Sequence, residues 1–131
     1  MKLRARELSE FIGSAAEKYH FDPANLIAVG YSNGANIAAA VLLLHPGSLS
    51  RAALFRAMVP IEPDEAPDLS GTSVFIAAGR KDPIIPPREA ERLARLLRGY
   101  GVQISLHWTD AGHRLAAEDI QAARTWLEKV G

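Results

Sequence analysis

The sequence predicts an α/β fold, in which a parallel sheet of about four strands is covered by helices on both faces. Two observations support this prediction. Short apolar runs alternate with longer segments whose apolar residues recur every three or four positions, which is typical of strands joined by crossover helices. The run at residues 26–30 is also apolar on both faces, as expected for a strand covered by helices on each side of a parallel sheet. The 131 residues, 48% of them hydrophobic, suit a single domain.

The first half of the chain is expected to contain two helices and two strands. The first segment is an amphipathic helix ending near His20, and its apolar residues are Leu8, Phe11, Ile12, Ala15, Ala16 and Tyr19. A strand that is apolar on both faces is predicted over residues 26–30, and a helix over 36–45. A second strand is predicted over 52–59.

The second half begins with a stretch that cannot sustain a regular strand. Residues 60–71 contain three prolines and four acidic residues and are predicted to form a long surface loop. Strands over 73–79 and 104–108 follow, with a helix over 87–98 between them. A last helix carries apolar residues at core spacing, namely Ile120, Ala123, Trp126, Leu127 and Val130.

A sharp elbow is predicted where the strand 26–30 meets the next helix. Its sequence is Gly30, Tyr31, Ser32, Asn33 and Gly34. In such an elbow side chains at the flanking positions would collide, so we expect both glycines to be required. Ser32 would project at the apex. The backbone N–H of Asn33 would lie at the helix start, where free donors and the helix dipole favour a developing oxyanion. The elbow predicts acyl transfer through a serine nucleophile.

Two possible partners of Ser32 follow in the chain, first an acid and then a histidine. Asp82 comes after the strand 73–79, and His113 lies in a turn after the strand 104–108. Because the carboxyl ends of parallel strands meet at one edge of a sheet, we expect all three side chains there. Asp82 could instead cap the turn before Pro83, and His113 could be a solvated turn residue. Asp110 is a rival acid, but only three residues from the histidine we interpret it as shaping the turn.

Each of these side chains suits one step of acyl transfer. A serine hydroxyl is a weak nucleophile at neutral pH and needs a base within hydrogen-bond reach. His113 would be that base, because an imidazole with a pKa of about 6.5 can accept the proton and later give it to the leaving group. Asp82 would fix the tautomer of the ring and stabilise the imidazolium.

Three segments resemble the α/β-hydrolase superfamily, close to its phospholipase/carboxylesterase (dienelactone-hydrolase-like) group of small bacterial serine esterases. They are residues 26–35, 77–86 and Gly112-His113, and together they span most of the chain. The resemblance is to the C-terminal part of that fold. It implies that Ser32, Asp82 and His113 form a catalytic triad and that the substrate is a small-molecule carboxylic ester or thioester.

The sequence departs from that group upstream of the nucleophile strand. Relatives have several earlier strands there, and a loop among them carries a second oxyanion donor, whereas residues 1–25 contain one helical segment. We therefore expect a single domain over residues 1–131 that lacks the first strands and that loop, and a weak enzyme. The hydrogen-bonding edge of the strand 26–30 and nearby apolar faces would then be exposed, and such an edge invites pairing with another chain. The alternative is an impaired hydrolase-like module that acts through homo-oligomerisation, binding or completion by another polypeptide.

Composition excludes several other classes of function. The 15 basic and 15 acidic residues balance, so the positive footprint of a nucleic-acid-binding protein is missing. Without cysteine there is no disulfide framework or thiolate nucleophile, and no histidine spacing suggests zinc. We expect neither metal nor cofactor. No apolar stretch approaches the roughly 20 residues that span a bilayer. We expect a soluble, cytoplasmic protein.

Overall fold

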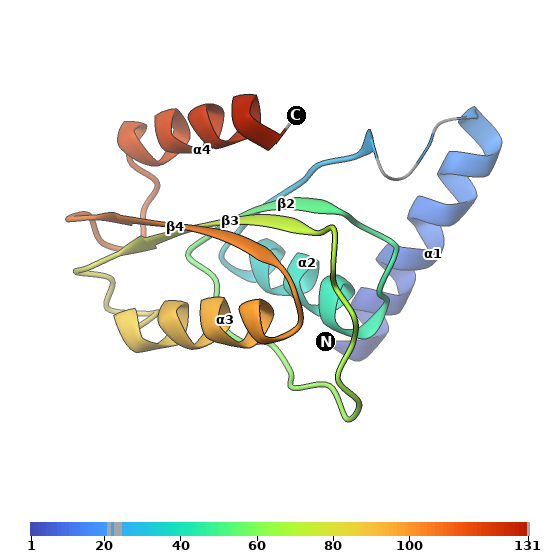
Figure 1. Cartoon of the computed structure of the whole chain (residues 1–131). Coiled ribbons are helices and arrows are strands. Elements are labelled where there is room, and N and C mark those ends of the chain that lie inside the picture. Colours follow the sequence, from blue (N-terminus) through green and yellow to red (C-terminus); the bar gives the residue numbers. More distant parts are fainter. Residues whose placement is uncertain (21, 23–24, 131) are drawn as a thin grey trace.

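The computed structural model describes residues 1–20, 22 and 25–130. Within them one sheet is formed by β1 (Ala28–Tyr31), β2 (Arg51–Phe55), β3 (Ser73–Gly79) and β4 (Gln103–Thr109). The strands are all parallel and lie in chain order, β1-β2-β3-β4 (Figure 1). The predicted parallel sheet of about four strands is confirmed.

Helices cover both faces of this sheet, as predicted. They are α1 (Lys2–Tyr19), α2 (Asn33–Leu44), α3 (Pro87–Gly99) and α4 (Ala117–Val130). In Figure 1, α2 and α3 lie below the sheet and α4 lies above it. α1 packs mainly against α2 rather than on the strands. Among the described helices, α4 therefore covers its face of the sheet alone.

The two faces of the sheet bury cores of different size. The larger core lies between the sheet and α2 with α3, and the apolar stretch 38–43 of α2 is buried there. A smaller core lies under α4, where Trp126 packs on Phe75 with ring centroids 5.9 Å apart. Burying side chains of this kind contributes about 1.5–3 kcal/mol each. These cores fix the strands whose carboxyl ends carry the candidate site.

Some predicted bounds hold and others are wrong. β3 covers the predicted residues, and β4 is longer by one residue at each end. β1 begins and ends later than the predicted 26–30, and α2 begins at Asn33 rather than at 36, directly after the elbow. β2 stops at Phe55 rather than at 59, because Arg56 adopts a φ of 58°, which interrupts an extended strand.

Apolar residues that were expected in the core are exposed near β1. Val29 is 72% exposed, and Ile120 and Leu127 of α4 are also exposed. All three line one apolar hollow of about 260 Å³. Helices were expected on both faces of the first strand, and apolar surface was expected to be exposed beside it. The described residues show the exposed surface, because α4 packs mainly over β3 and β4. The predicted apolar spacing of α4 is correct, but no described element covers the part of its apolar face that carries Ile120 and Leu127.

The segment 60–71 is a loop, as predicted. Leu69 is buried and anchors it, and its backbone N–H donates to the Tyr100 carbonyl at 2.8 Å. None of the described helices is both long enough and apolar enough to cross a lipid bilayer.

Candidate active site

The elbow between β1 and α2 holds Ser32 in a strained conformation. Its φ of 55° and ψ of −116° lie outside the regions that side-chain-bearing residues prefer, and its backbone N–H donates to the Phe55 carbonyl at 2.8 Å. A Cβ on Gly30 would lie 2.7 Å from backbone atoms of Gly34 and Ala35, so glycine is required there. A Cβ on Gly34 would meet nothing within 4 Å, and the predicted second collision is wrong.

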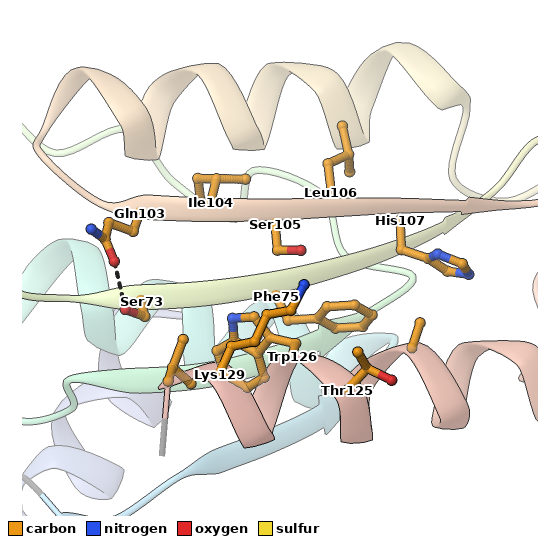
Figure 2. Close-up of a pocket in the computed structure, with 12 residues that line it drawn as sticks. Ser73, Phe75, Gln103, Ile104, Ser105, Leu106, His107, Thr125, Trp126 and Lys129 are labelled. Carbon is orange, nitrogen blue, oxygen red and sulfur yellow. Dashed lines mark hydrogen bonds between the residues drawn. The ribbon is translucent and has the colours of Figure 1, made fainter.

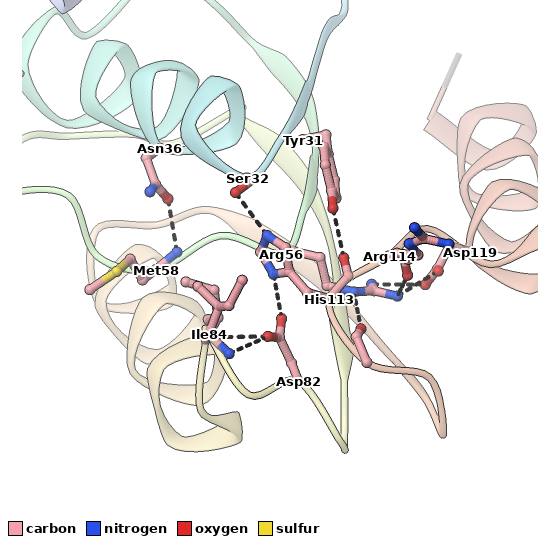
Figure 3. A network of polar contacts seen from close by, with 12 residues as sticks. Tyr31, Ser32, Asn36, Arg56, Met58, Asp82, Ile84, His113, Arg114 and Asp119 are labelled. Carbon is pink, nitrogen blue, oxygen red and sulfur yellow. Dashed lines mark hydrogen bonds and ion pairs between the residues drawn. The ribbon is translucent and has the colours of Figure 1, made fainter.

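The structure brings Ser32, His113 and Asp82 together at the carboxyl edge of the sheet (Figure 3). The Oγ of Ser32 lies 2.9 Å from Nε2 of His113, and Nδ1 of His113 lies 2.8 Å from Oδ2 of Asp82. Because an ionised carboxylate only accepts hydrogen bonds, Asp82 favours the tautomer with the proton on Nδ1. Nε2 is then free to accept the Ser32 proton.

Asp82 is held as a carboxylate by its surroundings. Its side chain is 1% exposed, and its Oδ1 accepts the backbone N–H groups of Ile84 at 2.8 Å and Ile85 at 2.9 Å. Burial acts to raise the pKa of Asp82, but the hydrogen bonds from Ile85, His113 and Ile84 outweigh it, so the pKa lies below its ordinary value. These contacts leave Oδ2 for the His113 ring.

Asn33 is the first residue of α2 and is exposed beside Ser32. A backbone N–H at this position has no acceptor within the helix, and it lies at the positive end of the helix dipole. The structure thus places a free backbone donor at the start of α2, directly after Ser32.

Two residues around His113 have contacts that the sequence analysis did not predict. Tyr31, treated there as part of the elbow, donates from its hydroxyl to the His113 carbonyl at 3.0 Å. Arg56, read there as part of a strand, is 1% exposed and forms an ion pair with Asp119 at 2.7 Å. One sequence feature could have indicated this contact: Arg56 is the one charged residue in the otherwise apolar run 52–59. A charge that is buried in such a run needs a partner.

Asp110, the rival acid, does not reach the His113 ring. It is exposed, and its Oδ1 lies 3.0 Å from Nη1 of Arg80. Among residues 1–20, 22 and 25–130, no three His, Asp or Glu side chains are grouped so that they could hold a metal ion.

The model of the dienelactone hydrolase family matches residues 2–127. The chain belongs to the dienelactone hydrolase family. The resemblance inferred from three short segments is confirmed at this level.

Relatives of this dienelactone hydrolase family chain are longer than it is. It is 46% identical over 128 residues to the Bacillus subtilis (strain 168) protein named "Putative hydrolase MhqD", covering 98% of this chain and 64% of that protein. A Bacillus cereus carboxylesterase structure has a TM-score of 0.95 and 42% identity, covering 98% of this chain and 61% of that one. A "Probable inactive carboxylesterase" of Oryza sativa subsp. japonica is 27% identical, covering 83% of this chain and 46% of that protein.

In this member of the dienelactone hydrolase family, a cavity of about 410 Å³ lies away from the Ser32 elbow. It runs between β4 and α4, with Phe75 and Trp126 among its apolar lining residues (Figure 2). Polar lining residues include Ser105 and His107, and neither Ser32 nor His113 contributes to it. This cavity is therefore separate from the Ser32–His113 contact at the carboxyl edge.

Proposed function

We propose that the chain is a carboxylesterase-type serine hydrolase that cleaves a carboxylic ester or thioester. The observation that carries the proposal is the continuous connection from the Ser32 hydroxyl through His113 to Asp82. Family membership and the carboxylesterase name of a 42%-identical structural neighbour support the reaction class. A small-molecule ester is the proposed substrate.

The proposed reaction has two halves. Ser32 Oγ attacks the ester carbonyl while Nε2 of His113 takes its proton, and the N–H of Asn33 stabilises the oxyanion. The C–O bond to the alcohol then breaks, the alcohol leaves with the proton from His113, and an acyl-enzyme remains on Ser32. Water, deprotonated by His113, attacks the acyl carbon, and the acid is released as Ser32 regains its proton. Asp82 holds the imidazolium in both halves.

The experiment is labelling with a fluorophosphonate, which reacts with an activated serine. Wild type is expected to be labelled, Ser32→Ala to be unlabelled, and His113→Ala to be slowed by at least about 1,000-fold. Ser14→Ala, at an exposed position on α1, is the matched control and should label like wild type. Equal labelling of wild type and Ser32→Ala, or labelling of neither, rejects the proposal.

The proposal also predicts how ester hydrolysis depends on pH. Protonated His113 cannot accept the Ser32 proton, so the rate should fall as the pH is lowered from about 8 to about 5. Initial rates with a chromogenic ester, measured across that range in constant ionic strength, provide the test. A flat profile would remove His113 from the role of base.

A second candidate function is supported by the open edge of the sheet. β1 is the outermost strand, with β2 as its one described neighbour, and the exposed Val29 and Leu127 lie on its uncovered side. An unpaired strand edge with apolar surface beside it favours pairing with another chain. We propose that a second copy of the chain pairs there. Size-exclusion chromatography with light scattering tests it, and a monomer at all concentrations would count against it.

A further inference from the structure

Arg56 is a buried charge beside the candidate site, and its guanidinium donates four hydrogen bonds. Its guanidinium makes a two-point contact with Asp119, from Nη1 to Oδ1 at 3.1 Å and from Nη2 to Oδ2 at 2.7 Å. Both side chains are 0% exposed. Removing two charges from water is costly, so a pair this deeply buried needs close contacts to persist.

The other donors of Arg56 are bound by the loop that carries His113. Nε donates to the Gly112 carbonyl at 2.9 Å, and Nη2 also donates to the Arg114 carbonyl at 3.0 Å. The His113 carbonyl between them accepts from the Tyr31 hydroxyl at 3.0 Å. Three successive carbonyls of this loop are therefore held by side chains from the end of β1 and just after β2 (Figure 3).

Asp119 connects the same contacts to the start of α4. Its Oδ2 accepts the backbone N–H of Ala116 at 2.7 Å, just before the helix begins at Ala117. A carboxylate in the first turn that accepts an N–H ahead of the helix fixes where the helix starts. The loop is thus fastened both at its carbonyls and at its exit into α4.

Arg56 is also next to the strand end that holds the nucleophile. The backbone N–H of Ser32 donates to the carbonyl of Phe55, the residue before Arg56. A short path through backbone and guanidinium therefore joins the Ser32 elbow to the His113 loop. The 2.9 Å separation of Ser32 Oγ and His113 Nε2 depends on the relative placement of these two segments.

We propose that Arg56 and Asp119 are positioning residues that hold the His113 loop at the distance the Ser32–His113 contact needs. The inference rests on the function proposed above for Ser32 and His113. It assigns to the buried pair a role beyond stability, because a pair that served only packing would not need to bind carbonyls on both sides of the histidine.

The decisive variant removes the whole pair. Replacing a buried ion pair by apolar residues is often neutral for stability, whereas removing one partner leaves an unpaired buried charge. Arg56→Met/Asp119→Leu should therefore unfold at a higher temperature than Arg56→Met, yet its fluorophosphonate labelling rate should stay about 100-fold below wild type, because misplacement of about 1 Å can cost that much. Arg56→Lys keeps the positive charge but lacks the two-point contact of a guanidinium, so its labelling rate should lie between those of wild type and the double variant.

A spectroscopic readout follows the same loop without any reaction. The Nδ1 proton of His113, hydrogen-bonded to Asp82, should give a downfield proton resonance that is absent in His113→Ala. It should weaken or vanish in the double variant. Glu62→Gln is the matched control, because Glu62 lies 2.6 Å from Arg92 in an exposed ion pair, and it should change neither labelling nor the resonance.

Each outcome decides one of the two proposals. A double variant that labels at the wild-type rate and keeps the resonance overturns the positioning role. Failure of Arg56→Met, Arg56→Lys and the double variant alike to fold also overturns it, since the pair would then be a stability element. If wild type is not labelled, the function of Ser32 is rejected, and the His113 resonance still decides whether the pair places the loop.

Discussion

The carboxyl edge of the sheet and the free side of β1 belong to one sheet, but they differ in how fully their groups have partners. At the carboxyl edge, carbonyls on both sides of His113 and both oxygens of Asp82 accept hydrogen bonds. Beside β1, Val29 is 72% exposed and an apolar hollow of about 260 Å³ is open. The geometry around Ser32 is thus specified within the described residues, whereas the surroundings of β1 are not.

The sharpest test of this contrast uses two neighbouring residues of α4. Trp126→Ala removes a ring that is buried on Phe75 and should lower the free energy of unfolding by about 3–5 kcal/mol. Leu127→Ala, one residue along and exposed, should change it by about 0.5 kcal/mol or less. Urea unfolding followed by circular dichroism measures both. Similar losses for the two variants would mean that the face beside β1 is covered in solution.

The two glycines of the elbow provide the next test. Gly30→Ala places a methyl group 2.7 Å from backbone atoms and should cost about 2–3 kcal/mol of unfolding free energy. Gly34→Ala meets nothing within 4 Å and lies in the first turn of α2, so it should be neutral or stabilise by up to about 1 kcal/mol. Chemical denaturation of both proteins measures the two unfolding free energies, and a penalty at Gly34 equal to that at Gly30 would contradict this elbow geometry.

Lowering the pH should reduce the stability of the fold through protonation of Asp82. The pKa of Asp82 in the folded protein is lowered below its unfolded value of about 3.9, so the ionised carboxylate stabilises the fold. This contribution is complete above the unfolded pKa and is lost as the pH falls through the folded one. The stability advantage of wild type over Asp82→Asn should therefore shrink between about pH 5 and pH 2.

The control for that experiment is Asp110→Asn, which alters an exposed carboxylate paired with Arg80. Exposed ion pairs contribute about 0–1 kcal/mol, so its effect on unfolding should be small at every pH. If the stability advantage of wild type over Asp82→Asn does not change with pH, the charge of the carboxylate is not what stabilises the turn from Asp82 to Ile85.

The smallest expected effect is at Asn33. The proposed oxyanion contact uses its backbone N–H, which Asn33→Ala retains, and its side chain is exposed. The fluorophosphonate labelling rate should therefore stay within about twofold of wild type. A much larger loss would indicate that the side-chain amide itself contacts the reacting group.

Local patterns predicted the parts of the fold that local chemistry determines. β3 was located because an uninterrupted apolar run ends at a glycine, and the elbow, the acid and the histidine were located because each follows a strand end. Parallel topology then brings those strand ends to one edge. The catalytic roles of Ser32, Asp82 and His113 stay predictions.

Features that depend on distant parts of the chain were not predicted. β2 ends early because of a positive φ at Arg56, and the partner of that arginine is 63 positions away. Likewise, the apolar spacing of α4 shows which side of the helix is apolar, but only the tertiary arrangement shows that Ile120 and Leu127 are uncovered. The periodicity of a sequence shows which face of a helix is apolar, but it does not show which element packs against that face.

The chain-ordered strands determine when the site can form during synthesis. Because each strand pairs with its predecessor, a nascent polypeptide can add β2, β3 and β4 in turn as the ribosome releases them. Ser32 and Arg56 are synthesised before His113 and Asp119, which lie in the loop before α4 and in its first turn. Until that part of the chain emerges, Ser32 lacks its hydrogen-bond partner and the Arg56 guanidinium lacks its buried counter-ion. The Ser32–His113 contact is therefore expected to form only after translation has reached α4.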